Sequence, residues 1–180
     1  YALCSDKAKP LQMKYKNYKF PSGLTDTLGI YHDFYKMKED YVILWFWDSD
    51  CGHCKKQTPK LHDLYKNLKE EERSVEVYAI NIEQESKAYL EYLRENKYGW
   101  INVQDTGHFS NFRAYYDIYS TPVAYILDKE RRIIGKRIDP ESMVGFFKQI
   151  FENEEKKSQI KKEEEPAEAK KLEDVRIAKE

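Results

Sequence analysis

The sequence lacks a long apolar run, since no stretch approaches the roughly 18–20 apolar residues that a membrane-spanning helix needs. It also carries almost no net charge, −1 from 31 basic and 32 acidic residues, which argues against a general attraction to nucleic acid or to an anionic membrane. Three cysteines are too few for a disulfide-stapled scaffold. We therefore expect neither membrane insertion nor a nucleic-acid partner, and a chain long enough for one packed domain with an appendage.

The beginning of the sequence offers no recognisable signal peptide. Because the chain starts at Tyr1 and not at a methionine, we expect any targeting segment to have been removed. Residues 1–20 contain five lysines interleaved with aromatic residues. We interpret them as a solvated edge segment. A polyanion-binding arm is the alternative, but lysines without arginine or a repeat are weak evidence for one. Residues 21–26, rich in Pro, Ser, Gly, Thr and Asp, predict a loop.

Two cysteines stand where an apolar run ends. Residues 41–47 are apolar throughout, which predicts a strand buried on both faces of a sheet. Cys51-Gly52-His53-Cys54 follows, and from Cys51 onward the apolar spacing of three and four predicts a helix that Pro59 should kink. Two cysteines three apart on one helical turn can close a small disulfide and reopen it. Thiol–disulfide exchange is therefore the first functional hypothesis.

The rest of the chain alternates between strand and helix patterns. The patterns predict strands over 75–82, 100–103, 123–127 and 132–137, and helices over 85–97, near 109–116 and from Asp139 onward. The last two strands surround a turn and should pair as a hairpin. This order is typical of a three-layer α/β domain, with a central mixed sheet flanked by helices.

The C-terminal segment differs in composition from the rest. Residues 151–180 contain ten acidic and eight basic residues, and only four large aliphatic ones. So little apolar surface cannot offset the entropy of ordering unless it docks on something. We therefore predict one domain over residues 1–151 and a charged extension over 152–180, either a solvated helix or a disordered tail.

The two cysteines are expected to play different roles. Cys51 falls at a helix N-terminus, where the unsatisfied amides and the helix dipole favour a thiolate, whereas Cys54 lies one turn further in and should be more buried. We expect Cys51 to attack a disulfide and Cys54 to resolve the mixed disulfide. His53 should stabilise the Cys51 thiolate and shift the couple to the oxidising side of thioredoxin, whose potential is about −270 mV.

Two other interpretations of the cysteines carry less weight. A structural zinc site usually needs a second ligand pair, and Cys4, His32, His62 and His108 each stand alone, so we expect no metal and no other cofactor. A purely structural disulfide would constrain little of the unfolded chain because its loop is so short. A binding or scaffold module with little redox turnover remains the alternative function. We expect a monomer, and plain surface positions for His32, His62 and His108.

Several positions together resemble the thioredoxin family. They are the strand over 41–47, the Cys51–Cys54 motif, Pro59 in the helix, and Thr121-Pro122 before a strand. The extra helix over 85–97 and the strand after it resemble the TlpA/ResA branch, which comprises thiol–disulfide oxidoreductases of the bacterial cell envelope. The resemblance implies protein thiols and disulfides as substrates, an unidentified redox partner, and a periplasmic site of action. It also implies that Pro122 is a cis-proline and that Thr121 offers backbone groups to a substrate.

The sequence departs from that family at the positions that usually tune the site. Asp50 replaces the tryptophan that commonly precedes the first cysteine; its carboxylate could cap the helix, yet its charge opposes thiolate formation. Trp45 and Gln57 occupy the positions of the two carboxylates that help to deprotonate the second cysteine. Either another acid such as Asp48 serves, or Cys54 is activated slowly. We expect Trp47 to pack in the core and near the active site.

Overall fold

The structure is a computed structural model that describes residues 23–83, 87–105 and 112–177. Cys4, the lysine-rich residues 1–20 and His108 lie outside the described residues. The described elements are, in chain order, β1 (Gly23–Asp26), β2 (Tyr31–Asp33), the 3-10 helix η1 (Phe34–Lys36), β3 (Tyr41–Trp47), α2 (Gly52–Glu70), β4 (Val75–Asn81), α3 (Lys87–Asn96), β5 (Ile101–Gln104), α4 (Phe112–Tyr116), β6 (Val123–Leu127), β7 (Ile133–Lys136) and α5 (Pro140–Ile177).

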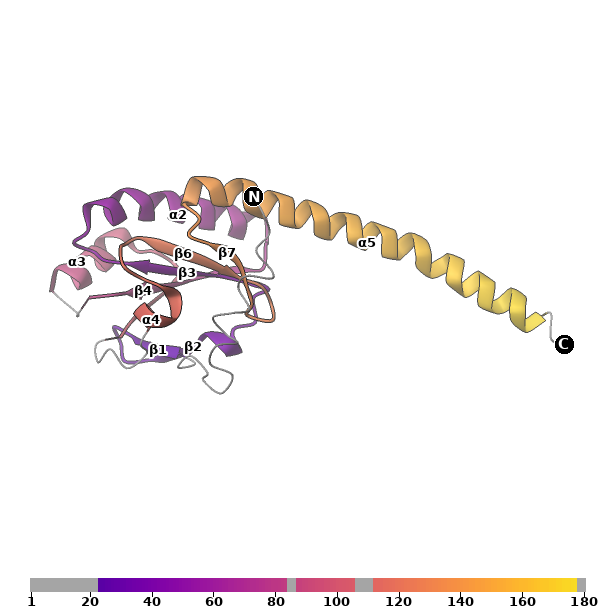
Figure 1. Cartoon of the computed structure of the whole chain (residues 1–180), viewed down its shortest axis with the longest axis horizontal. Helices are drawn as coiled ribbons and strands as arrows, with labels where there is room; N and C mark the ends of the chain where they lie inside the picture. The colour runs from indigo at the N-terminus through magenta and orange to yellow at the C-terminus, as the bar shows by residue number, and fades with distance from the viewer. Residues whose placement is uncertain (1–22, 84–86, 106–111, 178–180) are drawn as a thin grey trace. The chain divides into compact units, whose positions relative to one another are not determined.

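The seven strands form one mixed sheet in the order β2-β1-β5-β4-β3-β6-β7 (Figure 1). Strands β3, β4 and β5 are parallel, β6 runs antiparallel to β3, and β7 runs antiparallel to β6. The apolar run over 41–47 forms β3 residue for residue, in the interior of the sheet. The predicted hairpin of β6 and β7 is present, with its turn closed by a 2.8 Å bond from Arg131 N to the Asp128 carbonyl. The predicted α/β fold class is confirmed.

Side chains that alternate along β3 face two different layers. Phe46 points to the layer with α4, where its ring centroid lies 5.3 Å from that of Phe112. Trp45 and Trp47 point to the opposite layer, where the Trp45 indole donates to Thr58 Oγ1 of α2 at 3.3 Å. Figure 1 accordingly shows α2 and α4 on opposite sides of the sheet. The sheet is thus buried on both faces, as the continuous apolar run predicted.

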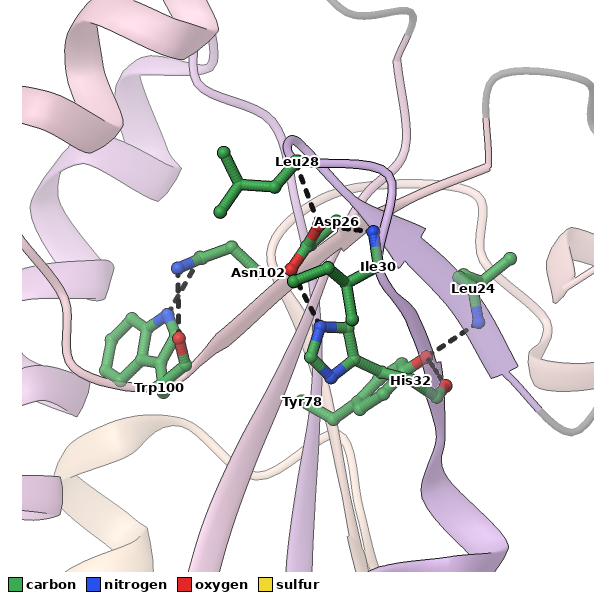
Figure 2. A network of polar contacts seen from close by, with 8 residues as sticks. All are labelled: Leu24, Asp26, Leu28, Ile30, His32, Tyr78, Trp100 and Asn102. Atoms are coloured by element: carbon green, nitrogen blue, oxygen red, sulfur yellow. Dashed lines mark hydrogen bonds and ion pairs between the residues drawn. The ribbon is translucent and has the colours of Figure 1, made fainter.

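The N-terminal hairpin of β1 and β2 corrects the prediction of a loop over residues 21–26, because Gly23–Asp26 forms a strand that pairs antiparallel with β5. Two of its hydrogen bonds are made with a distant residue, Tyr78. The Tyr78 hydroxyl of β4 accepts from Leu24 N at 2.9 Å and donates to the His32 carbonyl at 2.8 Å (Figure 2). The strand is therefore stabilised by tertiary contacts that no local pattern of residues reveals.

A single carboxylate closes the turn of this hairpin. Asp26 Oδ1 accepts from Leu28 N at 2.8 Å and from Ile30 N at 2.9 Å, while Oδ2 lies 2.8 Å from His32 Nε2 (Figure 2). His32 is thus a partly buried hydrogen-bonding residue and not the plain surface residue that we expected. His62 differs from that expectation in the same way, since its ring packs edge-on against Trp100 with centroids 5.5 Å apart.

The chain forms two compact units that divide between Glu141 and Ser142. The second unit begins inside α5, which continues without a break through residue 151 and on to Ile177. Residues 152–177 of the charged extension belong to this helix. Inside this helix the rings of Phe147 and Phe151 stack, with centroids 5.8 Å apart. No helix in the described ranges is both long enough and apolar enough to cross a membrane.

Candidate active site

The turn between β3 and α2 carries the first cysteine to the start of the helix. Asp50 N donates to Asp48 Oδ1 at 2.8 Å, and Cys51 N donates to the Asp48 carbonyl at 3.3 Å, so Asp48 organises this turn with both its side chain and its backbone. The N-cap residue of α2 is Cys51, and it makes no side-chain cap bond. The expectation that Asp50 caps the helix is therefore wrong; its side chain lies exposed.

The two cysteines are both thiols, and their surroundings differ. Cys51 is partly exposed, whereas Cys54 is completely buried. Burial by itself would raise the pKa of the Cys51 thiol, but hydrogen bonds from Cys54 and from the backbone of His53 outweigh it and lower the pKa. At Cys54 burial dominates and raises the pKa to about 12. The motif therefore pairs a more acidic accessible thiol with a less acidic buried one.

The loop before β6 supplies the other side of the site. The Thr121–Pro122 peptide bond is cis, as the resemblance predicted for Pro122. The Cys51 thiol donates to the Thr121 carbonyl oxygen, with Sγ and O 3.7 Å apart. Only the protonated thiol can make this bond, because a thiolate has no hydrogen to donate. The structure thus brings together two segments 70 residues apart, the cysteine motif and the cis-proline loop.

A small cavity of about 150 Å³ adjoins this junction. Gln57 from α2 lines it, and the Gln57 Oε1 atom is buried with no hydrogen-bond partner. The other lining residues are Trp45, His53, Ser120, Pro122, Val123, Ala124, Arg137, Ile138, Asp139 and Pro140. Gln57 thus contributes to the wall of a mixed polar and apolar cavity next to the cysteine motif, and its side-chain oxygen is buried without a partner.

Of the residues that we expected to tune the cysteines, His53 lies at the cavity and Trp47 lies in the core. His53 is exposed and lines the cavity, and the contact that lowers the pKa of Cys51 comes from its backbone. Trp47 packs in the core, with its ring centroid 5.8 Å from that of Tyr89 on α3. The tryptophan that borders the cavity is Trp45, two residues earlier on the same face of β3.

Two charged residues near the site were not singled out from the sequence. Arg137 lines the cavity, and its guanidinium donates to Asp117 Oδ2 at 3.1 Å and also to the Asp117 carbonyl. The pair joins the end of β7 to the loop after α4. Its two members lie 20 residues apart in the chain and belong to no motif, so only the tertiary structure reveals the pair. Within the part of the chain that the structure describes, no group of three His, Cys, Asp or Glu side chains could hold a metal ion.

The chain is similar to thioredoxin-like proteins and to thiol-disulfide oxidoreductases. A family model described as thioredoxin-like matches residues 39–133, which include the cysteine motif and the cis-proline. The thiol-disulfide oxidoreductase ResA of Bacillus cereus is 24% identical over 71% of this chain and 73% of its own length. The sporulation thiol-disulfide oxidoreductase A of Bacillus subtilis is 27% identical over 57% of this chain and 62% of its own length.

A solved structure shares more sequence with the chain. A domain of a possible thiol-disulfide isomerase from Cytophaga hutchinsonii is 42% identical, with a TM-score of 0.66 over 74% of this chain and 90% of that domain. The match covers nearly the whole of that domain. The similarity therefore extends over a complete domain and is not confined to the cysteine motif.

Proposed function

Because the chain belongs to the thioredoxin-like family, and its relatives are thiol–disulfide oxidoreductases of the ResA type, we propose that it exchanges its Cys51–Cys54 dithiol with the disulfides of protein substrates. The observation that carries this proposal is the asymmetry of the two thiols. An accessible thiol with a lowered pKa suits attack, and a buried neighbour suits resolution.

The proposed exchange proceeds in two displacements. The Cys51 thiolate attacks one sulfur of the substrate disulfide, a Cys51–substrate S–S bond forms, and the other substrate sulfur leaves as a thiolate that takes up a proton. Cys54 then loses its proton and attacks Cys51 Sγ, which releases the second substrate thiol. The substrate disulfide gains two electrons, and the dithiol becomes the Cys51–Cys54 disulfide. Each displacement is reversible, so the difference in reduction potential from the partner sets the direction.

The position of Thr121 supports its role in holding the substrate. Its carbonyl oxygen lies 3.7 Å from Cys51 Sγ, next to the cis-proline. A substrate segment that passes the Cys51 sulfur in an extended conformation therefore comes within reach of the Thr121 backbone. We assign substrate binding to Thr121 and Pro122, and attack and resolution to Cys51 and Cys54.

The second displacement should be the slower one. Burial raises the pKa of Cys54 to about 12, so its thiolate is scarce at neutral pH. Asp48 uses its carboxylate in the turn before the helix, where it accepts from Asp50 N. Gln57 borders the cavity but cannot take up a proton. We therefore propose that deprotonation of Cys54 limits release of the mixed disulfide.

We further propose that the protein acts in the bacterial cell envelope, on its periplasmic side. The resemblance to the TlpA/ResA branch supports this location, as do the ResA relatives. A thiol exchanger there needs a partner that restores its redox state. Fractionation of cells that carry the full-length protein tests the location, and recovery from the cytosol alone would contradict it.

Trapping the mixed disulfide tests the proposed function. In a Cys54→Ala variant the second displacement cannot occur, so substrate proteins should accumulate on Cys51 and dissociate on addition of dithiothreitol. A Cys51→Ser, Cys54→Ala double variant is the matched control and should trap none. Insulin reduction by the wild-type protein provides a second readout. Absence of both trapped proteins and insulin reduction would favour a scaffold with little redox turnover.

A further inference from the structure

Tyr119 stands out among the aromatic residues that the structure describes. Its exposed fraction is 85%, whereas other tyrosines such as Tyr78 and Tyr125 are completely buried in the core. An exposed ring leaves apolar surface in water, although isolated cases are common on protein surfaces. Exposure alone therefore assigns no role, and the location of this ring has to be considered.

Tyr119 belongs to the loop that carries the partner of the reacting sulfur. Thr121, whose carbonyl oxygen lies 3.7 Å from Cys51 Sγ, follows it by two residues. Two residues of extended chain span at most about 7 Å, so the Tyr119 backbone lies within that distance of the Thr121 backbone. Ser120, between them, lines the cavity next to the cysteines. The exposed ring thus belongs to the residue that precedes Ser120, at the edge of the candidate active site.

The chain segment before Tyr119 is held in place. Ile118 is buried, and its N–H donates to the Arg113 carbonyl of α4 at 3.0 Å. Asp117 is bound by the Arg137 guanidinium at 3.1 Å. These two anchors fix the path of the loop immediately before Tyr119. A ring presented from a fixed loop can bind a ligand with little further loss of entropy.

We propose that Tyr119 determines substrate specificity by packing against an apolar side chain next to the substrate cysteine. This inference rests on the proposed function and names the substrate class for the same site. The charged pair closest to Tyr119 in the chain does not favour a charged ligand, since Asp117 and Arg137 form an ion pair. The ring itself offers an apolar face.

The chemistry of cysteine in proteins defines the substrate class. Cysteine is among the most buried residue types, so its neighbours in folded proteins are often apolar. A cysteine with apolar neighbours that can still reach Cys51 belongs to a segment that has not finished folding, or has been unfolded. We infer that Tyr119 directs the exchange toward such segments and away from surface disulfides with polar neighbours.

Three matched peptides test this inference. Each carries one cysteine as a mixed disulfide with glutathione, flanked by leucine, by serine or by arginine, with dithiothreitol as the final reductant. Wild-type protein should show a kcat/KM about tenfold higher for the leucine peptide than for the serine peptide. Tyr119→Ala should abolish this ratio, and Tyr119→Phe should keep it because the ring is retained. Tyr31→Ala is the control, since Tyr31 is an exposed tyrosine of β2, which β1, β5 and β4 separate from β3.

The outcomes separate this inference from the proposed function. An unchanged leucine-to-serine ratio in Tyr119→Ala would overturn the inference while the exchange activity stands. An equal fall for all three peptides would also overturn it, because Tyr119 would then act on the cysteines and not on the substrate. A preference of the wild-type protein for the arginine peptide would overturn apolar packing and indicate a cation–π contact with Tyr119. Failure of the wild-type protein to reduce any peptide would overturn the proposed function, and this inference with it.

Discussion

Cys51 and Cys54 are the same side chain in two different environments, three residues apart. Hydrogen bonds lower the pKa of the accessible Cys51 against the opposing effect of its burial, whereas burial raises the pKa of Cys54. Because only a thiolate is nucleophilic, we propose that the first thiol attacks and that the second waits for a proton acceptor. The proposed order of the two displacements thus follows from the depth of each sulfur in the fold.

Alkylation of the reduced protein checks this asymmetry. In a Cys4→Ser background, the rate of iodoacetamide modification at Cys51 should rise with pH through a midpoint below about 8.5, the ordinary thiol value. Cys54 should stay unmodified over the neutral range because its thiolate forms only near pH 12. Peptide mass mapping assigns each adduct. Equal modification of both cysteines at pH 7 would show that the environments do not differentiate them.

A carboxylate at position 57 should speed the second displacement. Gln57 lies three residues after Cys54 in α2, so the two side chains share a helix face. In Gln57→Glu, a general base would border the cavity, and release of the mixed disulfide at pH 7 should become at least about tenfold faster. Stopped-flow kinetics measures the release, with Gln57→Met as the control of similar size. Equal rates in both variants would rule out proton removal as the limiting step.

Site residues that belong to a sequence motif could be predicted from the sequence. Residues that reach the site only through the tertiary structure could not. Cys51, Cys54 and Pro122 belong to local patterns and lie together in the structure. Trp45 and Trp47 are indistinguishable in the sequence, because both are apolar and share one face of β3. Only the placement of the helices decides that Trp45 borders the cavity while Trp47 meets Tyr89.

The elements could be predicted to the extent that their own residues define them. Strand β3 and helix α2 carry their apolar periodicity within a single segment, so the sequence pattern located them correctly. Strand β1 does not, because the segment Gly23–Asp26 has a single large apolar residue, Leu24. It becomes a strand through pairing with β5 and through the hydroxyl of Tyr78, both distant in the chain.

The carboxylate of Asp26 should stabilise this hairpin in a pH-dependent way. Burial raises its pKa, but hydrogen bonds from His32 and from two backbone N–H groups outweigh that effect and lower the pKa. A carboxyl with a lowered pKa adds stability above its unfolded value of about 3.9 and loses it as pH falls through the folded value. Asp26→Asn should therefore lower the free energy of unfolding by about 1–2 kcal/mol at pH 7.

Urea titrations at several pH values measure this effect. The difference between wild type and Asp26→Asn should shrink as the pH falls below about 4, because the wild-type carboxyl is then protonated as well. Asp40→Asn, which alters an exposed carboxylate outside the hairpin, is the control and should leave stability nearly unchanged at every pH. A difference for Asp26→Asn that stays constant down to about pH 2, well below the ordinary carboxyl pKa, would exclude the charge as its cause.

At the scale of the whole molecule, the seven-stranded sheet brings the cysteine helix and the cis-proline loop together. The predicted division into a domain over 1–151 and an extension over 152–180 makes the extension dispensable for this arrangement. A chain that ends at residue 151 should unfold at the same temperature and exchange disulfides at the same rate as the full chain. Calorimetry and insulin reduction measure the two. A lower unfolding temperature or a slower exchange in the shortened chain would show that residues 152–180 contribute to stability or to activity.

The central claim is that the Cys51–Cys54 dithiol exchanges two electrons with a protein disulfide through a mixed disulfide on Cys51. Incubation of the reduced protein with a protein disulfide, followed by acid quenching, alkylation and mass spectrometry, tests it most directly. We predict one Cys51–Cys54 disulfide formed for each substrate disulfide reduced, with mixed disulfides on Cys51 at early times. Substrate reduction that leaves both cysteines as thiols, or mixed disulfides on Cys54 in place of Cys51, would contradict the account.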